Sequence, residues 1–276
     1  MKRGLILIGV ASVDTLRNLK AVEVGVARMR VWGNSQEMHV IELSDKDSKI
    51  GIGEIRKAVG EMLSVPTLKQ LWIYFAGHGI NIAYKDYWLL NDAATESGEA
   101  VDINESVIRA EHCKLEHVIF VGDTCRLLAR TMKFHGITGT PIFPNLHTAG
   151  GPTKVDEYYS STIGEPSLEV KLDQEEYSPV YTELLCEVLS GKHPFLHEHD
   201  ENVETQVVRP WKLHDFLHEN VPKRLLEHSV PANITQIPNS RIRSRPEAWL
   251  SDVSKYVLPQ HNVKRISELT KNEELE

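Results

Sequence analysis

Two apolar runs, each ending in a chemically reactive side chain, constrain this chain more than any other feature. Residues 71–79 read Leu-Trp-Ile-Tyr-Phe-Ala-Gly-His-Gly, and residues 117–125 read His-Val-Ile-Phe-Val-Gly-Asp-Thr-Cys. Both runs are rich in β-branched and aromatic residues without polar alternation, which is typical of strands buried on both faces of a parallel sheet. The carboxyl ends of parallel strands meet at one edge, so we expect His78 and Cys125 to be neighbours there.

The flanking segments alternate between strands and helices. In the first half we expect strands near residues 4–10, 38–43 and 86–90, and helices over residues 13–29, 50–63 and 104–113 (with Asn104 as the N-cap). In the second half we expect a long loop over residues 131–154, strands at 155–163 and 233–238, and helices at 179–189, 210–226 and 247–257. This order predicts a mostly parallel sheet with helices on both faces.

Composition narrows the class of protein. The chain has 276 residues, of which 41% are hydrophobic, enough for a sizeable core. A net charge of −8 argues against a nucleic-acid binder, because a phosphate backbone requires a basic face. No apolar run approaches membrane-spanning length, so no membrane partner is expected. The three cysteines show neither an even disulfide framework nor metal-type pair spacing, which predicts a reduced, cytoplasmic protein.

A cysteine and a histidine at adjoining strand ends are the parts of a nucleophilic site. The thiolate of Cys125 is the reactive form, and His78 can take the thiol proton. The backbone N–H groups of Gly79 and Cys125 are candidate donors to a developing oxyanion. The competing interpretation is that each short motif is a chance match and that the cysteine is inert core; both motifs in this order favour catalysis.

The two motifs together resemble the caspase fold, and specifically its metacaspase and bacterial caspase-like branch. The resemblance is carried by residues 75–79 and 122–125, by the separation of 47 residues between His78 and Cys125, by residues 178–185 and by Gln-Ile-Pro at 236–238. It implies a caspase-like three-layer α/β/α sandwich around a mostly parallel sheet of about six strands. It also implies a peptidase domain over residues 1–240 (4–130 large-subunit-like, 131–154 loop, 155–240 small-subunit-like) and a charged C-terminal extension over 241–276.

The resemblance implies a cysteine endopeptidase that cuts after Arg or Lys through a Cys125–His78 dyad. Asp123, two residues before the cysteine, matches the metacaspase acid that selects a basic side chain, and a carboxylate in a confined pocket favours a cation. An orienting or structural role for Asp123 is the alternative. Metacaspases carry a second acid in the first helix, where this sequence has Gly25 with Glu23 nearby. The remaining expected pocket residues are Ala76, Ser160 and Ser161.

The expected partners are a protein or peptide with Arg or Lys at the cleavage site, and an activating protease or regulatory protein. Basic residues after the cysteine make the 126–154 loop a candidate for processing, or they merely solubilise it; these are Arg126, Arg130, Lys133 and Lys154. A role in bacterial defence or programmed death follows only from analogy. No cofactor or metal is expected, and calcium activation, known in several metacaspases, cannot be read from this sequence.

Two other functions remain open at this point. A catalytically silent caspase-like scaffold could use the groove to hold a partner. A zinc hydrolase could be built on the tract of His193, His197 and His199 with Glu198 and Asp200, although nothing in the sequence makes about four ligands converge, and a solvated polar loop is favoured.

Overall fold

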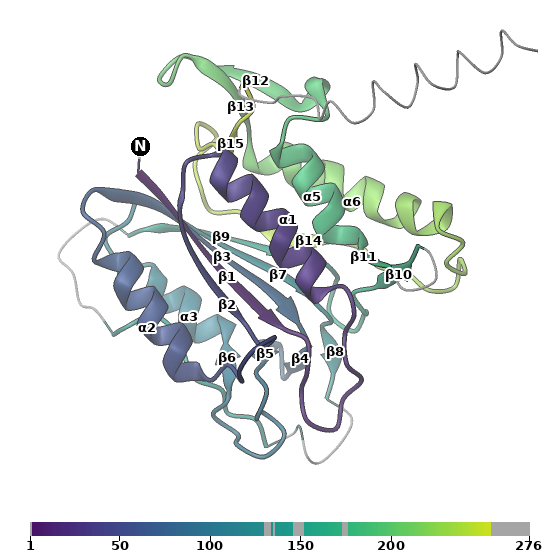
Figure 1. Cartoon of the computed structure of the whole chain (residues 1–276). Helices are drawn as coiled ribbons and strands as arrows, with labels where there is room; N and C mark the ends of the chain where they lie inside the picture. The colour runs from purple at the N-terminus through teal and green to yellow at the C-terminus, as the bar shows by residue number, and fades with distance from the viewer. Residues whose placement is uncertain (1, 130–133, 135, 146–151, 173–175, 255–276) are drawn as a thin grey trace, which may run out of the picture.

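The fold has three layers, with a central sheet between two groups of helices (Figure 1). The computed structural model describes residues 2–129, 134, 136–145, 152–172 and 176–254. Its helices are α1 (Val22–Ser35), α2 (Ile52–Leu63), α3 (Ile103–Ala110), α5 (Val180–Leu189) and α6 (Pro210–Glu227), with a 3-10 turn at Pro194–Leu196. Helices α1, α5 and α6 cover one face of the sheet, and α2 and α3 cover the other (Figure 1). None of these helices has both the length and the apolarity that a bilayer crossing requires.

The central sheet has six strands in the order β14-β9-β7-β3-β1-β2. Their bounds are β1 (Lys2–Val10), β2 (His39–Ser44), β3 (Leu68–Gly77), β7 (His117–Thr124), β9 (Lys154–Tyr159) and β14 (Asn239–Arg241). All neighbouring strands run parallel except β14, which is antiparallel to β9 at the edge. The predicted α/β/α sandwich around a mostly parallel six-stranded sheet is therefore confirmed.

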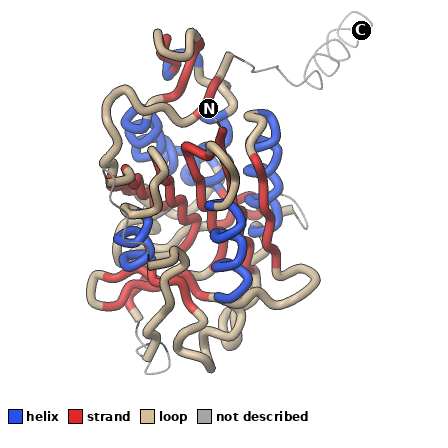
Figure 2. The backbone as a smooth tube through the Cα atoms, turned by 90° about the vertical axis from the view of Figure 1, so that its left-hand side faces the viewer, coloured by secondary structure: helices blue, strands red, loops and turns tan. Residues whose placement is uncertain are grey.

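Three smaller sheets occur over the residues that the structure describes. One contains β4 (Gly79–Ile82), β5 (Lys85–Leu89), β6 (Ala100–Asp102) and β8 (Leu127–Leu128); the others contain β12 (His197–Asp200), β13 (Thr205–Val208) and β15 (Ser251–Asp252), and β10 (Glu169–Lys171) with β11 (Tyr177–Pro179). The sheet that contains β4 and β8 lies beyond the carboxyl ends of the central strands, whereas the β12–β13 hairpin projects at the opposite end of the molecule (Figures 1 and 2). The two ends of the central sheet are therefore covered by different elements.

Both faces of the central strands are buried, which explains their unbroken apolar runs. On β3, Ile73 and Phe75 enter the core beneath α2 and α3, whereas Trp72 and Tyr74 enter the core beneath α1, α5 and α6. All four side chains are fully inaccessible to solvent. Successive side chains of a strand point to opposite faces, so a strand between two helical layers requires apolar residues at every position.

The first helix begins later than the apolar spacing predicts. Residues 11–21 form a loop, and α1 starts at Val22. Leu16 and Leu19 pack against the cores from this loop. Thr15 has a φ of 72°, a left-handed value that interrupts a right-handed helix. The loop between β1 and α1 therefore passes over the carboxyl end of the sheet instead of extending the helix.

Four other expectations need correction. The N-cap of α3 is Asp102, whose carboxylate accepts the Glu105 N–H at 2.8 Å, whereas the side-chain oxygen of Asn104 accepts the Asp86 N–H at 2.9 Å. β9 ends at Tyr159, short of the predicted residue 163, and the last strand of the sheet lies at 239–241 instead of 233–238. Where a helix was expected at 247–257, residues 251–252 form β15, and residues 255–257 lie outside the described residues.

Some residues after position 240 pack against the rest of the chain. Leu250 and Val253 are buried in the core beneath α1, α5 and α6, and β15 pairs with β13. Within the described residues up to 254, these apolar side chains anchor the start of the C-terminal segment, and the division of the chain at residue 240 stays a prediction.

Phe120 tests how much the sheet depends on this packing. Its buried ring lies between Trp88 and Phe143, at centroid distances of 6.2 and 5.8 Å. We expect Phe120→Ala to lower the free energy of unfolding by about 3–5 kcal/mol in urea denaturation, because the substitution removes buried apolar surface and leaves a cavity. Ile108→Ala on α3, where the side chain is 54% exposed, is the matched control and should cost under about 0.5 kcal/mol. Equal effects of the two substitutions would contradict this account of the core.

Candidate active site

His78 and Cys125 lie at the carboxyl ends of two adjacent parallel strands. β3 and β7 pair in a register that places Gly77 opposite Thr124, and each reactive residue directly follows its strand. Parallel pairing therefore brings both residues to neighbouring positions at one edge of the sheet. Both residues belong to the described part of the chain, and their side chains are each hydrogen-bonded to backbone groups of other segments and not to one another.

A backbone carbonyl orients the imidazole of His78. Its Nε2 atom lies 2.7 Å from the carbonyl oxygen of Arg17, in the loop before α1. A carbonyl oxygen only accepts, so Nε2 carries the proton, and Nδ1 is the nitrogen that can take up another. Burial lowers the pKa of His78 and outweighs the contact with the carbonyl, which favours the protonated form. The imidazole is therefore neutral at pH 7.

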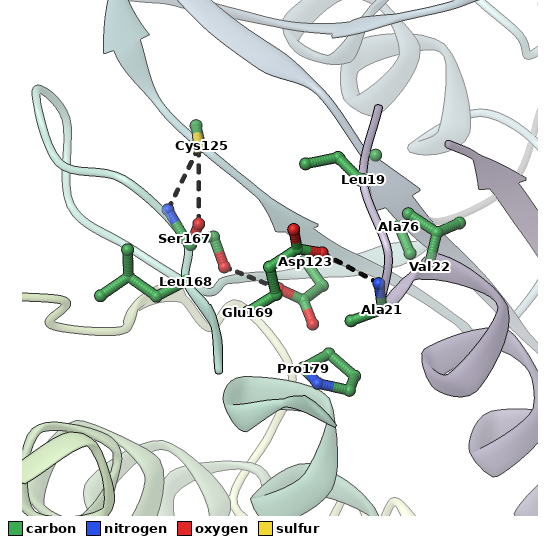
Figure 3. Close-up of a pocket in the computed structure, with 11 residues that line it drawn as sticks. Leu19, Ala21, Val22, Ala76, Asp123, Cys125, Ser167, Leu168, Glu169 and Pro179 are labelled. Carbon is green, nitrogen blue, oxygen red and sulfur yellow. Dashed lines mark hydrogen bonds between the residues drawn. The ribbon is translucent and has the colours of Figure 1, made fainter. Parts of the chain in front are cut away.

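The backbone of Ser167 holds the thiol of Cys125. The Ser167 N–H donates to the sulfur over 3.3 Å, and the thiol donates to the Ser167 carbonyl over 3.6 Å (Figure 3). Burial raises the pKa of Cys125, and the nearby charge of Asp123 adds to this rise, which a backbone hydrogen bond from Ser167 only partly opposes. Burial therefore favours a protonated thiol at Cys125 and, at the end of the adjacent strand, a neutral imidazole at His78.

Gly79 provides the close approach between β4 and the cysteine. A Cβ atom at this position would lie 2.6 Å from the carbonyl oxygen of Cys125, so only glycine fits. Gly79 pairs with Trp88 of β5, and the Leu89 N–H donates to the His78 carbonyl, which makes Gly79–Trp88 a non-hydrogen-bonded pair. The N–H of Gly79 therefore points away from β5. Its role as an oxyanion donor stays a prediction.

Asp123 is a buried acid that accepts hydrogen bonds from two hydroxyl groups. Oδ1 accepts from Ser167 Oγ at 2.7 Å, and Oδ2 accepts from Thr182 Oγ1 at 2.5 Å. Burial raises the pKa of Asp123, the two hydroxyls oppose the rise, and the charge of Glu169 adds to it. In this conformation the hydrogen bonds fit a structural role for the carboxylate. Because burial disfavours the ionised form of Asp123, a cation placed beside it would stabilise that form.

A small cavity of about 40 Å³ lies beside the thiol (Figure 3). Its lining includes Ala76, Asp123, Cys125, Ser167, Glu169 and Pro179. Two of the expected pocket residues, Ala76 and Asp123, thus share a cavity with the candidate nucleophile. One water requires about 10–15 Å³, so this space holds only a few waters. It does not hold a basic side chain while Ser167 stays in place.

The other expected pocket serines lie behind the site. The hydroxyl of Ser160 accepts from the Thr124 N–H and donates to the Thr124 carbonyl, both at 3.1 Å, and the hydroxyl of Ser161 donates to the Glu165 carbonyl at 3.2 Å. Both serines are completely buried, and neither lines the cavity. Ser160 instead fixes the backbone of the residue that precedes Cys125.

Glu23, the other acid expected in the pocket, does not line this cavity. Its carboxylate accepts a hydrogen bond from Ser44 at the end of β2. At Gly25, the position that corresponds to the metacaspase acid, a Cβ would lie 2.6 Å from the hydroxyl of Tyr74. This face of α1 therefore packs against the sheet and leaves no space for a carboxylate.

Sequence reasoning missed Ser167, Glu169 and Thr182. Thr182 lies within residues 178–185, which carry the resemblance. Ser167 lies in an irregular segment after β9, and Glu169 begins the three-residue strand β10, which is too short to show a periodic pattern. Gln236 holds this segment in place: its amide donates to Ser167 Oγ at 3.2 Å, and its carbonyl oxygen accepts the Leu168 N–H at 2.9 Å. The Gln-Ile-Pro motif was the available signal, although it was interpreted as part of a strand.

Arg126 is not a surface processing site. It is 3% exposed, it makes two hydrogen bonds to Asp86 at 2.9 and 2.6 Å, and its guanidinium lies 4.0 Å from the ring centroid of Tyr159. The arginine thus anchors the backbone that follows the nucleophile. Lys154 is the first residue of β9, whereas Arg130 and Lys133 lie outside the described residues.

The histidine-rich tract is organised by ion pairs. His193 contacts Glu187 at 3.1 Å, and Glu198 and Asp200 both pair with Arg209. Within the ranges that the structure describes, no group of three or more His, Cys, Asp or Glu side chains could hold a metal ion. The zinc-hydrolase interpretation therefore gains no support from this tract.

Comparison with known proteins supplies the fold and nothing finer. No family model and no curated protein matches the sequence. Among solved structures, the Drosophila initiator caspase Dronc is similar with a TM-score of 0.55 and 10% identity, covering 87% of this chain and 79% of that one. Protein GSU0716 from Geobacter sulfurreducens is similar with a TM-score of 0.54 and 14% identity, covering 91% of this chain and 100% of that one. The chain therefore has a caspase-like fold.

Proposed function

We propose that this chain is a cysteine endopeptidase that cleaves protein or peptide substrates after arginine or lysine. The observation that carries the proposal is that Cys125 and Asp123 line one cavity while His78 follows the adjacent strand. A thiol beside a carboxylate suits a peptide whose cationic side chain immediately precedes the scissile bond. The caspase-like fold supports the same reaction class by analogy.

In this mechanism the Cys125 sulfur attacks the scissile carbonyl carbon while the thiol proton passes to Nδ1 of His78. The C–N bond then breaks, and His78 gives the proton to the departing amine, which leaves an acyl group on the sulfur. A water molecule attacks this acyl carbon as His78 takes its proton. The S–C bond breaks, and the proton returns to the sulfur. The backbone N–H groups of Gly79 and Cys125 are the proposed donors to the oxyanion.

The closed arrangement around Ser167 suits the resting state of such an enzyme. Ser167 contacts both the sulfur of Cys125 and the carboxylate of Asp123, so a substrate side chain reaches the acid only after Ser167 moves. This closure suits an enzyme that waits for an activating protease or a regulatory protein. A place in bacterial defence or programmed death belongs to the proposal through the family resemblance alone.

A catalytically silent scaffold that binds a partner is the second candidate. The observation that favours it is the closed site, in which the thiol is protonated and bound to Ser167. The two candidates differ in one measurable property, namely whether any activating condition gives peptide cleavage that requires Cys125.

Substitution of the dyad tests the catalytic assignment. We expect Cys125→Ala and His78→Ala each to reduce cleavage of fluorogenic peptides ending in Arg or Lys by about 10³-fold or more, because the nucleophile or its base is lost. Peptides ending in Asp should stay uncut by all forms. Cys186→Ala, on α5 outside the cavity, is the matched control and should retain cleavage.

Two outcomes would overturn this assignment. Cleavage that survives Cys125→Ala and stops on addition of a chelator would indicate a metal hydrolase. Wild-type protein that stays inert under every activating condition, including limited proteolysis and added calcium, would indicate the scaffold.

The protonation of the resting dyad can be tested through the reactivity of Cys125. Burial places the pKa of this thiol above its ordinary value of 9.0 and that of His78 below 6.5. Only the thiolate reacts, so the rate of alkylation by iodoacetamide, followed by mass spectrometry of the Cys125 peptide, should be low at neutral pH and keep rising past pH 9.0. His78→Ala should change this profile little. A fast rate that is already level at neutral pH and that His78→Ala abolishes would show a thiolate–imidazolium pair instead.

A further inference from the structure

The cavity beside Cys125 contains a second carboxylate, supplied by an unexpected element. Glu169 is the first residue of β10 and lines the same cavity as Asp123 (Figure 3). Its side chain is 9% exposed, so the acid is largely buried. The two carboxylates come from segments far apart in sequence, β7 and β10, and they are close enough that the charge of Glu169 raises the pKa of Asp123. The second carboxylate of the cavity is therefore Glu169, and not the Glu23 that the sequence suggested.

The partners of Glu169 divide into two fixed groups and one replaceable group. Its Oε2 atom accepts the backbone N–H groups of Lys20 at 2.7 Å and Ala21 at 2.9 Å, just before the first residue of α1. Its Oε1 atom pairs with the guanidinium of Arg17 at 3.1 Å. The backbone donors hold the carboxylate in place, whereas the side chain of Arg17 is 74% exposed. Exposed ion pairs of this kind are weak, so another cation can replace Arg17 at Oε1.

The electrostatics of the pocket favour a single incoming cation. Asp123 receives hydrogen bonds from two hydroxyl groups, and its burial beside Glu169 disfavours its ionised form. A cation placed between the two carboxylates relieves their mutual repulsion and interacts with both. A neutral or acidic side chain gains nothing from this arrangement. The guanidinium of Arg17 already shows that Glu169 accepts a ligand of this chemistry.

We propose that Glu169 is a specificity-determining residue that, together with Asp123, receives the cationic side chain of the substrate residue before the scissile bond. In the free protein the guanidinium of Arg17 is paired with the carboxylate of Glu169, and the hydroxyl of Ser167 is hydrogen-bonded to the carboxylate of Asp123. The incoming side chain displaces both. This inference rests on the function proposed above. It extends that function by identifying Glu169 as the second acid and Arg17 as the group paired with Glu169 before substrate binds.

The first test uses peptide cleavage by the full chain. Two peptides are compared that differ only in having arginine or its neutral isostere citrulline before the scissile bond. We expect Glu169→Gln to reduce the preference for arginine over citrulline about tenfold, with the loss in KM and not in kcat. Glutamine keeps an oxygen for the two backbone N–H groups, so the start of α1 stays capped. Glu176→Gln, an exposed neighbour of β11 outside the cavity, is the matched control.

The second test needs no catalysis and uses agmatine, which carries a guanidinium and a terminal ammonium, with N-carbamoylputrescine as its counterpart, in which an uncharged urea replaces the guanidinium and the ammonium is kept. Binding is measured by calorimetry and by protection of Cys125 from iodoacetamide. We expect wild type to bind agmatine in preference to N-carbamoylputrescine, Glu169→Gln to bind agmatine about tenfold more weakly, and Arg17→Gln to bind it about threefold more tightly because a competing cation is gone.

The outcomes separate this inference from the proposed function. Agmatine binding that depends on Glu169 in a protein that cleaves no peptide would support the cation pocket and reject the peptidase. Cleavage that requires Cys125 but shows the same arginine preference in Glu169→Gln would support the peptidase and reject the role of Glu169. Failure of wild type to bind agmatine at millimolar concentration, or equal binding by wild type and Glu169→Gln, would also overturn the inference.

Discussion

Parallel pairing of β3 with β7 is the constraint on which the candidate site depends. The register that places Gly77 opposite Thr124 leaves His78 and Cys125 as the next residue on each strand. This pairing is stabilised from both sides, because each strand sends alternate side chains into each of two cores. The reactive groups are thus positioned by the most deeply buried part of the molecule, and the loops around them supply only orientation and charge.

The central strands could be predicted from the sequence because burial on both faces requires an unbroken run of apolar residues. In β3, Trp72 and Ile73 enter opposite cores, so no polar position interrupts the run. The start of α1 could not be predicted in this way. Leu16 and Leu19 have helical spacing, yet they contact the core from a loop, and spacing alone does not distinguish these two ways of burying an apolar side chain.

In the candidate site, too, some residues could be predicted from the sequence and others could not. The strand ends position His78, Cys125 and Asp123, and these strands can be recognised in the sequence, so the three residues could be placed. Ser167 and Glu169 could not, because their positions depend on tertiary contacts with Gln236 and with the residues just before α1. The closed arrangement of the site therefore depends on these contacts between residues far apart in sequence. The sequence motifs identify the reactive groups, but they do not show which side chains contact those groups in the folded protein.

The pairing of β7 with β9 has a consequence for any break in the chain between them. These strands are hydrogen-bonded neighbours along the register from His117–Lys154 to Gly122–Tyr159, and Val155 and Phe120 belong to a common core. A nicked molecule would keep one continuous sheet, held by noncovalent contacts alone. A nick would thus leave the two halves associated, with the backbone after the nucleophile still anchored by Arg126 and by the pairing of β8 with β4. A fragment truncated just after β7, in contrast, would expose a bare strand edge and tend to aggregate.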